Sequence, residues 1–222
     1  MHCNRSIPNL ILAIALCAFG STGALAQYEP NDNYSTFVLS YQSSKFSSPI
    51  CINGECHESV SGPAVVYARQ IFQNFALGMA GSQLQSSAKS SSVTSTNVSV
   101  FLQAIAGMGP GFDIGASVAG LNTSTELCTV IPNACSSASD IGTDLGVFGK
   151  AFITEGKTLS LTLAYDAIYY QKLPNESIIG LSLVGILAKH HRLALSVSSV
   201  RDQSGNEISG GLGFGYSYIV YY

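Results

Sequence analysis

The last eleven residues of the chain alternate between large apolar side chains and small ones. Leu212, Phe214, Tyr216, Tyr218, Val220 and Tyr222 form one set, and Gly213, Gly215 and Ser217 lie between its first members. Because successive side chains of a β-strand point to opposite faces, this stretch has one aromatic, apolar face and one nearly bare face. Such a pattern is typical of a transmembrane barrel strand, with lipid outside and a crowded lumen inside.

The composition agrees with a protein that embeds much of itself. Hydrophobic residues make up 46% of the chain and charged residues only 10%, which excludes a disordered protein. After residue 26, no apolar run approaches the ~18 residues that a spanning helix needs, and a membrane otherwise accepts only a closed barrel. A soluble β-sandwich would also alternate, but its outward faces would be polar rather than rich in Leu and Tyr. The sequence therefore predicts an all-β fold, an antiparallel transmembrane meander barrel.

The N-terminus predicts export. Arg5 supplies a charged start, Ile7–Phe19 is apolar, and Ala24–Ala26 offers a cleavage site of small residues. We therefore expect residues 1–26 to be a cleaved signal peptide and residues 27–222 to be the barrel domain.

The charge of the mature chain disfavours nucleic acid as a partner. The whole chain has 10 basic and 13 acidic residues, and Arg5 is the only charged residue before residue 27, which leaves 9 − 13 = −4. Cys17 resembles a lipidation site, but Leu16 before it is larger than such sites prefer. We expect no lipid anchor.

Alternation from Gln27 onward predicts ten strands, and a barrel of eight with one hairpin outside the membrane is the alternative. The predicted strands are 34–45, 62–72, 75–86, 95–107, 112–122, 140–153, 158–171, 178–188, 192–201 and 207–222. Odd-numbered connections, such as 46–62 and 123–139, are long and polar, whereas even-numbered ones are short. This alternation predicts an outer-membrane protein with short periplasmic turns, periplasmic termini and longer outer loops.

The final strand ends on an aromatic residue and resembles the C-terminal strand of bacterial outer-membrane β-barrels. The resemblance implies a signal that the barrel-assembly machinery reads. That signal would consist of Phe214, Tyr216, Tyr218, Val220 and Tyr222. The hairpin Tyr67–Gly78 is similar to hairpins of the opacity-protein and OmpA-type barrel superfamily. Together these two segments imply an architecture and an address, not an activity.

Facing is predicted from the same alternation. The residues expected to face lipid include Phe37, Leu39, Tyr41, Val98, Val100, Leu102, Phe112, Ile114, Ala116, Val118, Leu145, Val147, Ile153, Leu159, Leu161, Leu163, Tyr165, Ala167 and Tyr169. Arg69 and Gln70 are adjacent, so one of the two points toward lipid unless it lies at the membrane edge or at a bulge.

A charged cluster is predicted inside the lumen, with Arg69 included if it faces inward. Its members are Arg69, Asp113, Asp144, Lys150, Asp166 and Lys172. If Thr154 faces Thr158 across a turn, Asp144 and Asp166 become diagonal neighbours on the inner face. The cluster is either a salt-bridge network that plugs a narrow barrel or a charged constriction that selects small solutes. Small inward residues favour an open lumen, and inward Phe101, Phe148 and Tyr170 oppose it.

Four cysteines remain after cleavage, an even number in an exported protein. They predict two local disulfides in the outer loops, Cys51–Cys56 around an Asn-Gly turn and Cys128–Cys135 around a Pro-Asn turn. A metal site is not expected, because neither spacing is that of a zinc knuckle and only His57 lies nearby.

Neither a catalytic site nor a cofactor is predicted. His57-Glu58-Ser59 joins a base, a carboxylate and a hydroxyl, but neighbours in an extended chain point to opposite faces and form a poor relay. His190 and His191 fall in a predicted periplasmic turn and either bind lipid phosphates or keep the turn solvated.

The predicted function is a structural or surface-interaction role through the disulfide-stapled outer loops, because a stapled loop loses less entropy on binding. A narrow passive channel is the alternative, and a lipid-modifying barrel enzyme is third. The expected partners are outer-membrane lipid, lipopolysaccharide and the barrel-assembly machinery, around a monomer.

Overall fold

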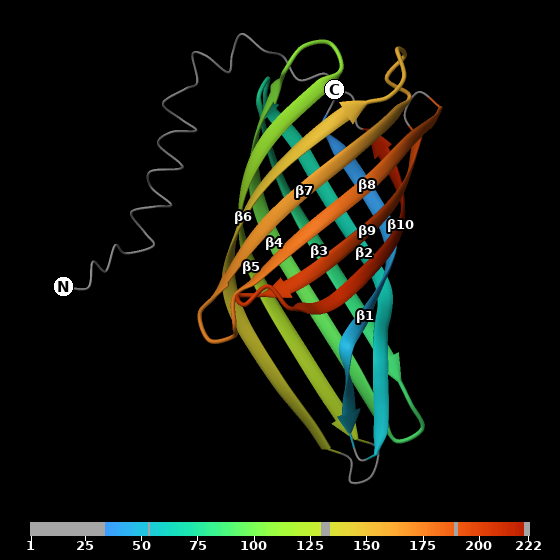
Figure 1. The fold of residues 1–222 in the computed structure, drawn as a ribbon, viewed down its shortest axis with the longest axis vertical. Coiled ribbons are helices and arrows are strands. Elements are labelled where there is room, and N and C mark those ends of the chain that lie inside the picture. The colour runs from blue at the N-terminus through green and yellow to red at the C-terminus, as the bar shows by residue number, and fades with distance from the viewer. Residues whose placement is uncertain (1–33, 53, 130–133, 189–190, 220–222) are drawn as a thin grey trace, which may run out of the picture.

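The computed structural model describes residues 34–52, 54–129, 134–188 and 191–219, and these form ten β-strands. Figure 1 shows them as one barrel with strongly tilted strands. The strands are β1 Thr36–Ile52, β2 Glu55–Phe72, β3 Phe75–Ser87, β4 Ser91–Gly107, β5 Phe112–Thr129, β6 Ala134–Phe152, β7 Leu159–Tyr170, β8 Glu176–Ala188, β9 His191–Asp202 and β10 Glu207–Ile219. Within the described residues, none of the elements is a helix long and apolar enough to span a membrane, a finding that has no bearing on membrane-spanning strands.

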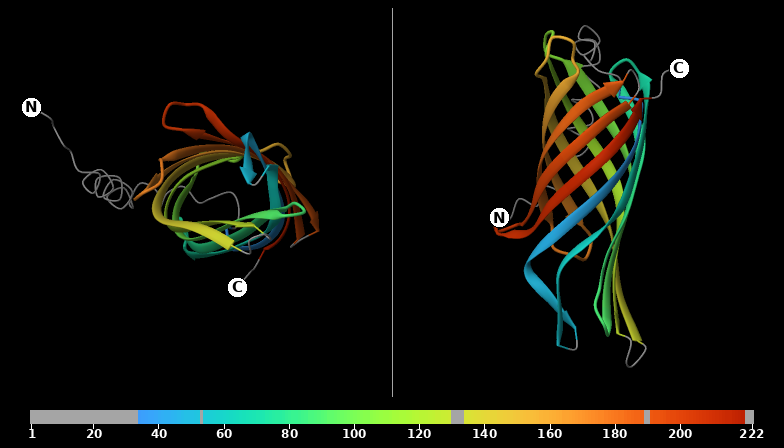
Figure 2. Two further views of the ribbon diagram at one scale, coloured as in Figure 1. Left: turned by 90° about the horizontal axis from the view of Figure 1, so that it is seen from below. Right: turned by 90° about the vertical axis from the view of Figure 1, so that its right-hand side faces the viewer.

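The ring closes between the first and the last strand. β1 pairs with β10 in antiparallel register from Thr36 opposite Ile219 to Phe46 opposite Ser209, and every other strand pairs with its neighbours in the chain. Figure 2 (left) looks along the barrel and shows the closed ring. The predicted all-β antiparallel meander of ten strands is therefore confirmed, and the eight-stranded alternative is wrong.

The two ends of the barrel differ. The turn end carries the even-numbered connections and the paired ends of β1 and β10, Thr36 and Ile219. The loop end carries the odd-numbered hairpins. Five of the strands β1–β6 have 17–19 residues, whereas β7–β10 have 12–13. The wall is therefore higher on one side.

On the high side, strands continue past the closed ring as an open sheet. β1 leaves β10 after Phe46, and β6 pairs with β7 only from Gly142 onward. Figure 2 (right) shows the β1–β2 hairpin and the ends of β3–β6 extending beyond the β9–β10 turn. We call this part the projecting sheet: residues 46–60, 84–93 and 122–141, apart from 53 and 130–133.

The prediction of long polar outer loops at 46–62 and 123–139 is wrong, because most of these residues are strands. Apolar side chains inside the projecting sheet explain the difference, since they are removed from water between the hairpins. Val60, Leu84 and Val93 are buried in one cluster. Phe46, Ile50, Ile52 and Leu127 pack against it. A solvated loop would leave these side chains in water.

The outer surface of the closed ring is apolar. Leu39, Val100, Leu163, Leu195 and Leu212 are 51%, 56%, 57%, 58% and 67% exposed. Inward positions on the same walls are small, as Ala64, Ala68 and Ala76 illustrate. A bilayer requires apolar side chains on the outside of a closed ring that leaves no main-chain edge unpaired. The protein is therefore a transmembrane barrel of the outer-membrane type.

Candidate functional site: the lumen and the projecting sheet

Four of the six predicted lumen charges face the lumen. Asp113 on β5 is fully buried and pairs in register with Lys150 on β6, which is 7% exposed. Its neighbours Phe112 and Ile114 are exposed on the outside. Asp144 and Asp166 likewise occupy inward positions of β6 and β7, since Asp144 is two residues before Gly146, the residue paired with Asp166.

Arg69 and Lys172 do not belong to this cluster, so the prediction for these two residues is wrong. Arg69 is exposed and pairs with the exposed Leu77, which places it on the outer face, beside a register shift between Gln70 and Phe72. Lys172 is exposed in the β7–β8 connection, where its N–H donates to Asp140 Oδ2 at 2.7 Å. The buried Asp140 carboxylate, at an inward position of β6 like Asp144, anchors this connection at the rim.

Asp144 and Asp166 are diagonal neighbours, as the Thr154–Thr158 turn predicts. The two threonine hydroxyls lie 2.9 Å apart, and the register opposes Gly146 to Asp166. A Cβ at Gly146 would lie 2.2 Å from Asp166 Oδ1 and 2.4 Å from Ser117 Oγ. The missing side chain thus creates the space in which Asp166 reaches across β6 toward β5.

Tyr34 crosses the lumen at the turn end. Its N–H donates to Gln70 Oε1 at 3.3 Å on β2, and its hydroxyl donates to Asp113 Oδ2 at 3.0 Å on β5. Its ring lies 6.1 Å from that of Phe148, and the Lys150 ammonium lies 5.3 Å from the Tyr34 ring centroid. Sequence reasoning missed this contact, because Tyr34 and Asp113 are 79 positions apart and no local pattern links them.

The inward aromatic rings of the wall lie against glycines of neighbouring strands. A Cβ at Gly115 would come within 2.3 Å of the Phe148 ring, and a Cβ at Gly78 within 2.3 Å of the Phe101 ring. Tyr170 covers Gly142 in the same way, at 3.0 Å. These rings therefore lie against the wall rather than across the lumen. A cavity of about 310 Å³ remains beside Tyr34, lined also by Gln103, Ser117, Phe148, Lys150, Thr162 and Asp166.

In the projecting sheet, polar contacts join the first two hairpins. Glu55 accepts hydrogen bonds from the Ser90 N–H and from the Ser91 hydroxyl, the latter at 2.7 Å. His57, only 2% exposed, lies 2.9 Å from Ser91 Oγ through Nε2 and 2.9 Å from Ser86 Oγ through Nδ1. Because Ser91 donates its one hydroxyl proton to Glu55, it accepts from the Nε2–H of His57. The β1–β2 tip is thus clasped onto the β3–β4 tip.

The clasp affects the acidity of Glu55. The hydrogen bond from the Ser91 hydroxyl, followed by that from the Ser90 N–H, holds the pKa of Glu55 below its ordinary value. The carboxylate is therefore favoured in the folded hairpins.

The projecting sheet ends in an open strand edge on β6. Residues 134–139 are all exposed, and in the described part of the chain no strand lies beside them on the side away from β5. Ile141 O accepts from Gln171 N on that side, so Cys135, Ser137 and Ser139, at the same phase of the strand, turn their main-chain groups toward it. The other edge is interrupted by Pro49 and by a register shift between Lys45 and Ile50.

Both predicted disulfides are present, Cys51–Cys56 and Cys128–Cys135, each joining directly opposed residues of one hairpin. Glu126 lies near the second pair, and the three residues have the spacing of a metal cluster. Disulfide sulfurs are not thiolates and do not bind a metal in that way, so this group does not fit a metal ion.

The residues considered for catalysis are separated. His57 is within hydrogen-bonding distance of Ser86 and Ser91, whereas the next two residues in the chain, Glu58 and Ser59, are exposed. Ser91 is itself buried, 2% exposed. The carboxylate Glu55 binds the serine rather than the imidazole, which is not the order of a nucleophilic triad.

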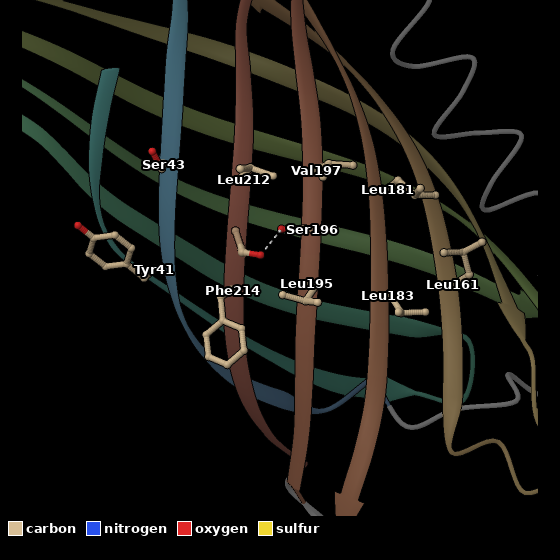
Figure 3. Close-up of a pocket in the computed structure, with 11 residues that line it drawn as sticks. Tyr41, Ser43, Leu161, Leu181, Leu183, Leu195, Ser196, Val197, Leu212 and Phe214 are labelled. Atoms are coloured by element: carbon tan, nitrogen blue, oxygen red, sulfur yellow. Dashed lines mark hydrogen bonds between the residues drawn. The ribbon is translucent and has the colours of Figure 1, made fainter. Parts of the chain in front are cut away.

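The outer face carries an apolar hollow of about 530 Å³ across β1 and β7–β10. Figure 3 shows Leu161, Leu183, Leu195 and Phe214 on adjacent strands at its border. Of the predicted assembly signal, Phe214, Tyr216 and Tyr218 are exposed on this face of β10. Val220 and Tyr222 lie outside the described residues, as do His190 and the signal peptide.

His191 begins β9 on the outer face. Its Nδ1 contacts the Tyr216 hydroxyl, and its ring centroid lies 5.4 Å from that of Tyr218. The residue is therefore part of an aromatic group near the membrane edge rather than of a free turn.

Comparison with known proteins finds similar proteins among solved structures, and those described below are outer-membrane barrels. No family model matches the chain, and no curated protein matches it. An outer-membrane channel from Pseudomonas putida F1 is 9% identical over 87% of this chain and 98% of its own, with a TM-score of 0.49. The translocator domain of the autotransporter NalP from Neisseria meningitidis is 13% identical over 96% and 98%, with a TM-score of 0.48. The attachment invasion locus protein Ail of Yersinia pestis is 8% identical over 82% and 95%, with a TM-score of 0.43. Nothing about this chain's activity follows from such distant likenesses.

Proposed function

We propose that the protein is an outer-membrane surface-interaction barrel, with its loop end outside the cell, that binds an extended protein segment along the open edge of β6. The observation that carries the proposal is this edge on a sheet held by two disulfides and a buried cluster. A preordered sheet loses little conformational entropy on binding.

An open edge binds through the main chain. Cys135, Ser137 and Ser139 present N–H and C=O groups to an incoming strand, and strand addition uses such groups for affinity. Folded proteins usually protect an edge with proline, charge or a bulge. The β1 edge has Pro49 and a register shift, whereas Ala134–Ser139 carries no charge. The two edges of one sheet thus differ as a blocked edge and a binding edge do.

The geometry favours a flexible partner and a monomeric barrel. Barrel strands tilt by about 35–45° from the membrane normal. Two copies in one membrane, related by an axis along the normal, would cross their β6 edges at a large angle and fail to pair. An extended segment of another protein has no such constraint.

The test uses a strand-forming probe and the barrel refolded in lipid nanodiscs. We expect a fluorescent alternating Thr-Val peptide of about eight residues to bind wild type. Ser137→Pro removes one donor of the edge and should weaken binding roughly tenfold. Ser137→Ala, the matched control, should leave it unchanged, because only the side chain differs.

A second control alters the peptide. Methylation of its alternate main-chain nitrogens should abolish binding if main-chain hydrogen bonds supply the affinity. Equal binding of the methylated and the plain peptide, or of Ser137→Pro and wild type, would count against the proposal.

Other partners belong to the same proposal. The apolar band would contact outer-membrane lipid and lipopolysaccharide, and β10 would be read by the barrel-assembly machinery. The termini would then be periplasmic. We propose no enzymatic role, because His57 is committed to the clasp between hairpins.

A further inference from the structure

Tyr34, whose contacts cross the lumen, does not belong to a strand of the barrel wall. Tyr34 precedes Thr36, the first residue of β1, and the pairing that closes the ring between β1 and β10 begins at Thr36. Displacing Tyr34 therefore breaks no pairing between strands of the ring. A residue of the wall, by contrast, cannot move its main chain without breaking such pairing.

The contacts of Tyr34 extend across the diameter of the ring. In a ring of ten strands, β1 and β6 lie opposite each other. Tyr34 is held on the near side by Gln70 of β2, and on the far side by Asp113 of β5 and by Phe148 and Lys150 of β6. One residue thus bridges both sides of the lumen.

The other inward rings do not bridge it. Phe101 lies against Gly78 and Phe148 against Gly115, each occupying space that a Cβ would fill. Beside Tyr34, the cavity of about 310 Å³ is lined partly by the hydrophilic side chains of Gln103, Ser117 and Thr162. Of these three inward rings, that of Tyr34 is therefore the one whose contacts extend across the lumen.

We propose that Tyr34 is the closing element of a path for small hydrophilic solutes through the barrel, and that its displacement opens this path. The bond from its hydroxyl to Asp113 is the latch, and the ring is the obstruction. This function is separate from binding at the β6 edge, which lies at the opposite end of the barrel.

Single-channel recording in planar bilayers tests the proposal. Wild type should be closed for most of the time. Tyr34→Ala should stay open and pass several-fold more current on average. Tyr34→Phe keeps the ring but loses the bond to Asp113, so it should open more often at the same open-state conductance. Tyr41→Ala is the matched control, because Tyr41 is 58% exposed on the outer face and should leave the current at the wild-type level.

A chemical readout distinguishes closure by Tyr34 from closure elsewhere. Ser117→Cys places a single free thiol at the cavity, since the other described cysteines are paired. A small membrane-impermeant thiol reagent, added at the turn end, should modify it faster when Tyr34→Ala is combined with it. Folding of each variant is verified by the gel-mobility shift on heating. Equal mean current and equal modification rates with and without Tyr34, in folded barrels, would overturn the proposal.

Discussion

At the scale of single residues, Gly146 shows how one missing side chain shapes the lumen. A Cβ there would lie 2.2 Å from Asp166 Oδ1 and 2.4 Å from Ser117 Oγ. We expect Gly146→Ala to displace Asp166 and to destabilise the barrel by about 1–3 kcal/mol, the usual cost of overpacking. Urea unfolding in detergent, followed by circular dichroism, measures the change.

The control for this prediction is Gly120→Ala on β5, where a Cβ would meet nothing within 4 Å. It should leave the unfolding midpoint nearly unchanged. Equal destabilisation by the two substitutions would mean that loss of glycine itself, rather than the clash with Asp166, sets the cost.

Glu55 gives the projecting sheet a dependence on pH. Hydrogen bonds from the Ser91 hydroxyl and the Ser90 N–H hold the folded pKa of Glu55 below its ordinary value of 4.5. Its contribution to stability is therefore present above about pH 4.5 and lost as the pH falls through the folded pKa. In wild type, hydrogen exchange at the β1–β2 tip should become faster at acid pH, relative to the intrinsic exchange rate of unprotected amides at the same pH. Glu55→Gln should show fast exchange at every pH, and an unchanged ratio between the two proteins across pH would contradict the prediction.

At the scale of elements, the two disulfides act on hairpin tips and not on the ring. Cys51 and Cys56 are separated by five positions and lie beyond the last residues that pair β1 with β10. Replacing both cysteines of this disulfide, by Cys51→Ser and Cys56→Ser, should lower the stability of the projecting sheet by roughly 2 kcal/mol, the entropy that a short closed loop contributes. The stability of the ring should not change. Limited proteolysis should then cleave the β1–β2 tip, while the gel-mobility shift on heating persists.

A result in which the whole barrel loses its mobility shift would show that the staples support the ring. Labelling provides a second measurement: thiol reagents should leave Cys51 and Cys128 unmodified until a reductant is added.

The strands themselves were predictable in different degrees. β7 and β8 lie within two residues of their predicted bounds, because apolar and polar residues alternate there without interruption. For the outer halves of β1, β2, β5 and β6 the sequence predicts loops, because their Ser-rich composition matches that of solvated turns. The cluster of Val60, Leu84 and Val93, which come from three different strands, orders the outer halves of β1, β2 and β5. The exposed end of β6 is ordered by its pairing with β5.

At the scale of the whole molecule, the apolar band and the closed ring act together. Leu195 on β9 lies on the outer face at 58% exposure, beside Leu183 and Phe214. Leu195→Arg should make the free energy of folding into lipid bilayers less favourable by about 2–4 kcal/mol, which is the cost of an arginine near the bilayer midplane. Ser204→Arg in the β9–β10 turn introduces the same charge outside the band and should cost little. Equal folding of the two variants into lipid vesicles would argue against a bilayer around this face.

The sequence by itself determined the fold class, the ten strands, the outward apolar faces and the two disulfides. These features depend on period-2 alternation and on partners close in the chain, which are local. Only the tertiary structure decided that Arg69 faces outward, that Lys172 lies over the rim and that Tyr34 crosses to Asp113. Ring closure brings residues far apart in sequence to the same height, and that height depends on the register of every strand between them.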